Sequence, residues 1–166
     1  MSSDQPSGCP GPDIPRPQDT KRWREQLRDK GVYHALLEFR DQIHRQVFET
    51  SNGIEAVSTA DDPEVVQLLH AHMTSMDKRM RRGDGLRTWD PLFAALFDQA
   101  GRIDTQFELT PCGLRVRTSG RDPDAVALIK AHSQVIGCFL LSGQAAFARP
   151  YAVPGTAVSP SAESQR

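Results

Sequence analysis

Histidine and methionine recur at helical spacing in one stretch of the chain. His72, Met76 and Met80 follow Leu68 at four-residue intervals, which places all four side chains on one face of an α-helix. Imidazole nitrogen and thioether sulfur together suit copper or haem iron. The spacing therefore makes His72 and Met76 candidate ligands of a transition metal or a haem.

A second stretch repeats the pattern 60 residues later and tests this interpretation. The corresponding positions hold Leu128, His132, Ile136 and Leu140. Aliphatic side chains coordinate no metal, so the methionines of the first stretch are typical of core filling, and Met76 stays a candidate third ligand in one stretch only. Both stretches retain the histidine, which makes His72 and His132 the principal candidate residues.

Two interpretations of the histidine pair stay open. A half-buried imidazole that donates to a backbone carbonyl or an acid would lock a helix against a hairpin, once in each copy. Alternatively, pseudo-twofold symmetry brings His72 and His132 together, so that they hold one metal ion, one haem iron or, when protonated, an anionic ligand. The outcome depends on which ends of the two helices meet across the axis.

The repeat that carries these histidines needs no gap over its strongest part. Shifted by 60 residues, residues 50–54 match residues 110–114, Asp62-Pro63 matches Asp122-Pro123, and Ala71-His72 matches Ala131-His132. We interpret this as a tandem duplication with copies at about 32–83 and 91–143. Each copy alone has too little core, so the two copies are expected to fold as one unit.

Each copy predicts a β-hairpin followed by a helix. An aspartate N-cap before proline at the first helical position starts a helix at Asp62, at Asp122 and, between the copies, at Asp90. Asn52-Gly53 is a strong hairpin signal. We therefore predict an α+β domain made of two helix–β-hairpin–helix units, which form one four-stranded antiparallel sheet with helices packed on one face.

The two ends of the chain differ in composition from the middle. Residues 1–19 contain five prolines, and residues 149–166 are rich in Pro, Ser, Ala and Gly, so both are predicted to be disordered. The single folded domain is placed at residues 20–148. It is expected to begin with a charged helix near residues 21–29 that Gly31 interrupts.

Composition favours a cytoplasmic protein. Twenty basic and 21 acidic residues give a formal charge of −1, which removes the electrostatic argument for nucleic acid or a membrane as partner. Three cysteines without a Cys-x-x-Cys motif fit a reducing compartment. No apolar run reaches the roughly 18 residues of a membrane helix, and the N-terminus has no apolar signal-peptide core.

The copies differ at the end of their helices. Residues 78–82 are mostly basic, whereas residues 137–141 are apolar. The basic run is typical of a solvated face near a helix C-terminus. The apolar run needs a cover, either from the N-terminal helix around Trp23 and Leu27 or from a second subunit, so a homodimer through Phe139, Leu140 and Leu141 is predicted.

Two large aromatic residues lie between the copies. Trp89 and Phe93 flank Asp90 at the start of the central helix. Trp89 is expected to anchor the core. If the fold encloses a cavity, these two aromatics and the paired histidines are the residues expected to line it, so they are the candidate ligand-binding residues.

Motifs for phosphate-binding loops, nucleophile elbows and zinc proteases are absent from the sequence. The pattern from Gly53 to His72, followed by Arg87-Thr-Trp-Asp-Pro-Leu-Phe93, resembles a group of small bacterial proteins of unassigned function. This resemblance implies a compact duplicated domain, and it implies no activity and no cofactor.

Three functions stay open at this point. The first is a small ligand-binding protein that binds a metal or haem through His72 and His132. The second is a non-catalytic interaction or assembly module with structural histidines. The third is a small enzyme that uses His72 or His132 as its acid–base group.

Overall fold

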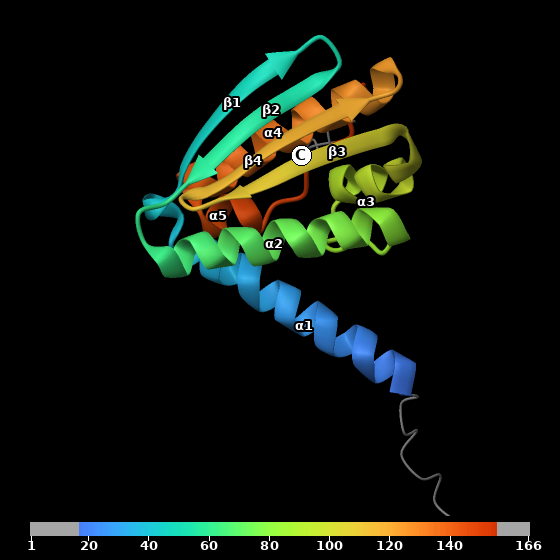
Figure 1. The fold of residues 1–166 in the computed structure, drawn as a ribbon. Helices are drawn as coiled ribbons and strands as arrows, with labels where there is room; N and C mark the ends of the chain where they lie inside the picture. The colour runs from blue at the N-terminus through green and yellow to red at the C-terminus, as the bar shows by residue number, and fades with distance from the viewer. Residues whose placement is uncertain (1–16, 156–166) are drawn as a thin grey trace, which may run out of the picture.

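The computed structural model describes residues 17–155. It is an α+β fold with one four-stranded antiparallel sheet in the order β1-β2-β4-β3 (Figure 1), which confirms the fold class and the sheet predicted from the sequence. Of the ends predicted to be disordered, residues 1–19 and 149–166, the parts 1–16 and 156–166 lie outside the described residues, whereas residues 17–19 begin α1.

The elements alternate between helices and hairpins along the chain. The helices are α1 (Pro17–Glu38), α2 (Pro63–Arg82), α3 (Pro91–Asp98), α4 (Pro123–Ser142) and α5 (Gln144–Phe147), with short 3-10 helices η1 (Arg40–Gln42) and η2 (Ala100–Arg102). The strands are β1 (His44–Thr50), β2 (Gly53–Thr59), β3 (Ile103–Thr110) and β4 (Gly113–Gly120). The helices gather on one face of the sheet (Figure 1).

The expected helix starts are confirmed. Asp62, Asp90 and Asp122 are the N-caps of α2, α3 and α4, and the side chain of each accepts a hydrogen bond from a backbone N–H in the first turn. Proline follows at the first helical position in all three helices, where a missing N–H costs nothing. These local signals therefore determine where the three helices begin.

The sheet is centred on the pairing of β2 with β4. Ala56 lies opposite Val116 in the middle of this ladder, and both residues face the helices from the sheet. At the ends of the ladder, a Cβ on Gly53 would overlap the carbonyl oxygen of Thr118. Gly113 meets the carbonyl oxygen of Ser58 in the same way, so both hairpins need glycine for close backbone approach.

Backbone hydrogen bonds between the two hairpins come in reciprocal pairs. The N–H of Ala60 donates to the carbonyl of Cys112, and the N–H of Gly120 donates to the carbonyl of Asn52. Helices α2 and α4 are both 20 residues long. The turn register is also the same in both hairpins, with Thr50 opposite Gly53 and Thr110 opposite Gly113, although β3 and β4 are one residue longer than β1 and β2.

Helix α1 is continuous, although an interruption at Gly31 was expected. A Cβ on Gly31 would meet no atom within 4 Å, and a single exposed glycine costs a helix only about 1 kcal/mol. Val32 and Leu36 pack this half of α1 into the core beside α2. The N-terminal half of α1 extends away from the sheet (Figure 1), so Trp23 and Leu27 are exposed and do not cover α4.

A buried ion pair ties the C-terminal segment to the fold. Arg87 donates two hydrogen bonds to Asp90, and its guanidinium also donates to the carbonyls of Phe147 and Arg149. Asp90 is fully buried and accepts from the N–H of Tyr151. The ring of Tyr151 packs against the apolar cluster under α4, so the ordered part extends past residue 148, where the sequence placed the boundary.

Helix α4 is, within residues 17–155, the one helix long and apolar enough to cross a membrane by length and composition. Only Asp124 and Lys130 interrupt it with charge. Such a helix is weak evidence for a membrane, because helices that pack in the core of a fold meet the same criterion. Here α4 packs against β2 and β4.

Candidate functional site

The two histidines of the repeat lie on α2 and α4, and each is partly buried. His72 follows the buried Leu69 on α2, and His132 follows the buried Ile129 on α4. Burial is the main cause that lowers the pKa of each imidazole. Electrostatic repulsion from His72 is a further cause that lowers the pKa of His132.

Both imidazoles are neutral at pH 7. The pKa of His132 falls to about 4, through burial first and then through the Arg45 guanidinium and His72. The pKa of His72 is also lowered by burial, and the Asp29 carboxylate offsets part of that shift. A neutral imidazole has a free lone pair on one nitrogen, which is the form that binds metals.

One nitrogen of the pair has no partner. Nδ1 of His72 is buried and forms no hydrogen bond with any described residue. The ring of His132 packs edge-on against Phe93, with 5.2 Å between ring centroids. Buried polar atoms without a partner are rare in native proteins, and an ion or a water usually accounts for them.

Charged side chains flank the pair on two sides. Arg45, on β1, donates to the backbone carbonyl and to Oγ of Ser133, the residue after His132. Burial lowers the pKa of Arg45. On the other side Asp29 is buried and pairs with Arg79, whose Nη2 lies 2.7 Å from its carboxylate. Asp29 therefore acts electrostatically on His72 from α1, and Arg45 acts on His132 from β1.

His70 performs the structural role that the sequence left open for His72. Its Nε2 lies 3.0 Å from the carbonyl oxygen of Thr110 and 2.6 Å from that of Gly113. Carbonyl oxygens only accept, so Nε2 carries the proton. At the equivalent position of α4, Lys130 lies 3.3 Å from the Glu49 carboxylate. Positions 70 and 130 thus tie each helix to the hairpin of the other half.

Met76 does not join a recognisable metal-binding group. It lies one turn beyond His72 on α2 and is half-buried. Among residues 17–155, no three His, Cys, Asp or Glu side chains come together in a way that could hold a metal ion. The pair therefore supplies two protein ligands at most, unless the Met76 thioether adds a third.

The two aromatic candidates have different positions. Phe93 is half-buried and contacts His132. Trp89, expected as a core anchor, is 59% exposed, and its ring stacks on the Arg87 guanidinium at 4.3 Å. The interior position is taken by Arg87 itself, which lies among the rings of Phe93, Phe139 and Phe147. Trp89 covers that cation from outside.

Cysteine and leucine side chains on α4 also differ from expectation. Cys138 is exposed, as is Cys112 at the β3–β4 turn, although its place between Gly137 and Phe139 in the apolar run of α4 is typical of a small buried side chain. Of the residues expected at a dimer interface, Phe139 is buried and Leu141 is 84% exposed. Phe139 packs under α3 and the C-terminal segment instead. The homodimer stays a prediction, now resting on Leu141.

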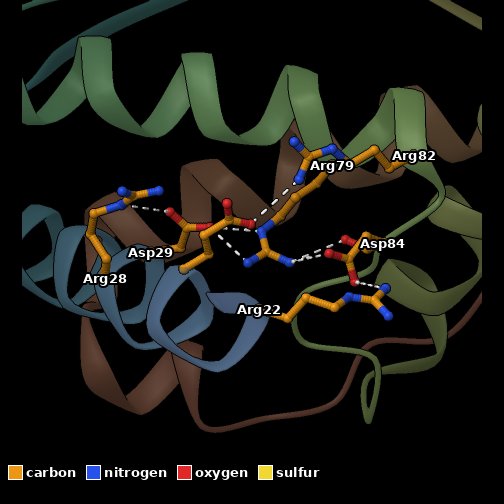
Figure 2. Close-up of polar contacts among 7 residues, drawn as sticks. Arg22, Arg28, Asp29, Arg79, Arg82 and Asp84 are labelled. Carbon is orange, nitrogen blue, oxygen red and sulfur yellow. Dashed lines mark hydrogen bonds and ion pairs between the residues drawn. The ribbon is translucent and has the colours of Figure 1, made fainter. Parts of the chain in front are cut away.

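A charged groove runs between α1 and α2. We call it the α1–α2 groove; its volume is about 380 Å³, and both helices contribute charged side chains to its lining. Figure 2 shows Arg79 between Asp29 and Asp84, with Arg28 and Arg22 at the two ends. Positive and negative charges alternate along this line, which begins at Arg28.

Arg45, Asp29 and the α1–α2 groove were missed by sequence reasoning. Arg45 lies in a strand whose other charged residues are exposed, and Asp29 lies in a helix that is charged throughout. Neither position carries a periodic signal that distinguishes it from a solvated charge. The basic run from Lys78 to Arg82 contributes to the groove, although the sequence predicted a solvated face there.

The fold and the site define an α+β protein with two partly buried, neutral histidines. No protein-family model, no curated protein and no solved structure matches the chain.

Proposed function

We propose that the protein binds a transition-metal ion through His72 and His132. The observation that carries the proposal is the buried Nδ1 of His72, which has no hydrogen-bond partner among the described residues, together with the electrostatic effect of His72 on a second neutral imidazole. A metal ion would give that nitrogen the partner it lacks. It needs less space than a haem or an organic anion, which suits rings packed among side chains such as Phe93.

We further propose that the pair arises from a tandem duplication with a pseudo-twofold axis. The pairing of Ala56 with Val116 and the reciprocal bonds of Ala60 and Gly120 support such an axis through the middle of the β2–β4 ladder. Residues at equivalent positions on α2 and α4 then approach one another across the axis. The effect of His72 on the pKa of His132 agrees with that arrangement.

Cu(I) is the ion that these surroundings favour. Arg45 forms no ion pair with a described residue, and its positive charge acts on His132, so a monovalent ion adds the least further charge to the site. Imidazole suits copper, and a thioether selects Cu(I) in particular, which leaves Met76 as the candidate third ligand. The cytoplasmic location expected from the cysteines is a reducing environment, consistent with Cu(I).

Anaerobic titration of the untagged protein with Cu(I) against a competing chelator tests the proposal. We expect one equivalent to bind, and His72→Ala or His132→Ala to weaken binding by about tenfold or more. His44→Ala is the matched control, because His44 is exposed on β1 and its loss should leave the affinity unchanged. Circular dichroism of each variant verifies that it is folded.

The proposal is wrong if the folded wild type binds no Cu(I), or if both folded histidine variants bind Cu(I) as tightly as the wild type. X-ray absorption of the loaded protein gives an independent measure. Two imidazole nitrogens in the coordination shell are expected, with one sulfur added if Met76 participates.

A second candidate function is a non-catalytic interaction module with structural histidines. Trp23 and Leu27 lie one turn apart on α1 and are 61% and 47% exposed. Large apolar side chains that gather on a surface mark interaction sites. On this alternative, substitution of either histidine lowers the melting temperature, and the wild type binds no metal.

A further inference from the structure

The α1–α2 groove holds more positive charge than its acids neutralise. Asp29 is paired with Arg79, and Glu25 lies 3.4 Å from Arg82. Lys78 also lines the groove, and it forms no ion pair with any residue of the described part of the chain. Arg28 is 70% exposed and reaches only to 3.9 Å from Asp29, so its charge is weakly compensated.

Hydroxyl groups lie beside the uncompensated cations. Thr74 and Ser75 line the groove from α2, one turn before Lys78, so the three side chains share one face of the helix. His70 lines the groove as well, but its Nε2 is bound to the carbonyls of the β3–β4 turn. The ammonium, the guanidinium of Arg28 and the two hydroxyls are therefore the donors available to a ligand.

We propose that the α1–α2 groove binds a small organic phosphate. A phosphate group has acceptor oxygens for several donors at once, and lysine beside hydroxyl groups is a common way to hold it. Arg28 adds the planar fork that suits phosphate oxygens. The volume of about 380 Å³ lies within the range of small-molecule sites, roughly 300 to 1,000 Å³.

The organic part of the ligand has an apolar wall available. Val32 from α1 and Ala71 from α2 line the groove on either side. Arg79 stays committed to Asp29 and Asp84 below them, so it holds the two helices together and is not the primary contact. This site is separate from the histidine pair, and it does not require the proposed metal to be bound.

Isothermal titration calorimetry of the metal-free full chain tests the inference, with AMP, adenosine and inorganic phosphate as probes. We expect AMP to bind at least about tenfold more tightly than adenosine, a difference of about 1.4 kcal/mol. Lys78→Gln should weaken AMP binding by a similar factor, and Ser75→Ala by a smaller one.

Arg115→Gln is the matched control for charge. Arg115 is exposed on β4, and it points away from the helices because its neighbours Leu114 and Val116 pack toward them. This variant loses the same unit of charge outside the groove, so its affinity for AMP should not change.

Three results would overturn the inference. They are an absence of saturable binding of AMP and phosphate at millimolar concentration, equal affinities for AMP and adenosine, and equal weakening by Lys78→Gln and Arg115→Gln. The last result would show attraction to the net charge alone. None of these outcomes bears on Cu(I) binding, so the two proposals fail separately.

Discussion

Helices α2 and α4 have the same length and the same kind of N-cap, yet different structures cover them. A buried ion pair between Arg79 and Asp29 joins α2 to α1. Aromatic packing joins α4 to α3, α5 and the C-terminal segment. One supersecondary unit can therefore be covered by either chemistry, provided that each buried charge has a partner.

The buried ion pairs in these two regions, Arg87–Asp90 and Arg79–Asp29, also differ in the sequence separation of their partners. Arg87 and Asp90 are three residues apart, and the arginine has a left-handed backbone with φ of 60°. Arg79 and Asp29 lie 50 residues apart in sequence, on α2 and α1. The first pair is thus local and holds the C-terminal segment, whereas the second is long-range and holds α1.

The largest expected effect is loss of the local pair. Asp90→Ala leaves the Arg87 guanidinium buried without its carboxylate, and it removes the α3 cap and the bond to the Tyr151 N–H. We expect the free energy of unfolding to fall by about 5 kcal/mol. Urea denaturation measures the free energy of unfolding. A loss below about 1 kcal/mol would contradict the interpretation that Asp90 stabilises the fold by pairing with Arg87 and capping α3.

Loss of the long-range pair is expected to cost somewhat less. Asp29→Ala leaves Arg79 with Asp84, which is partly exposed, so water and this acid compensate part of the charge. We expect a loss of about 4 kcal/mol, together with increased hydrogen exchange of α1. If hydrogen exchange of α4 rises as much as that of α1, the α1–α2 contact and the packing around α4 do not unfold independently.

The pH dependence of stability tests the burial of His132, one of the two histidines that recur at an offset of 60 residues. The pKa of His132 is about 4 in the fold, below its ordinary value near 6.5. Between pH 6.5 and about 4, His132 is protonated in the unfolded chain but stays neutral in the folded chain. The free energy of unfolding therefore falls as the pH drops from about 6.5 to about 4. The total loss is about 3 kcal/mol for metal-free protein.

Urea denaturation across this range measures the effect, with His132→Leu and His44→Ala as comparison variants. The leucine variant should lose the part of the slope that His132 contributes, whereas the alanine variant of the exposed His44 should keep it. An unchanged slope in His132→Leu would show that the imidazole titrates normally in the fold.

The smallest expected effect compares positions 70 and 130. His70→Ala removes the bond from α2 to the β3–β4 turn and is expected to cost about 1 kcal/mol. Lys130→Ala removes a partly exposed ion pair with Glu49 and should cost less than about 0.5 kcal/mol. Equal losses of stability in both variants would mean that the hydrogen bond from His70 Nε2 to the carbonyls of Thr110 and Gly113 is no stronger than the exposed ion pair of Lys130.

Local chemistry explains most of what the sequence predicted correctly. Aspartate before proline marks three helix starts, and Asn52-Gly53 marks a hairpin. These signals act within a few residues, so they need no knowledge of the fold. The prediction that Gly31 interrupts α1 was wrong, because the packing of Val32 and Leu36 in the core outweighs the small cost of a glycine within a helix.

The sequence by itself determined the α+β class, the order of helices and hairpins, and which residues recur at an offset of 60, because all of these depend on local propensity and periodicity. Only the tertiary structure decided that Arg87 takes the interior position expected of Trp89, that His70 bonds to the hairpin, and that Asp29 and Arg45 flank the histidine pair. The reason is physical: whether a polar side chain is buried, paired or orphaned depends on segments brought together across the fold, and no spacing within one segment contains that information.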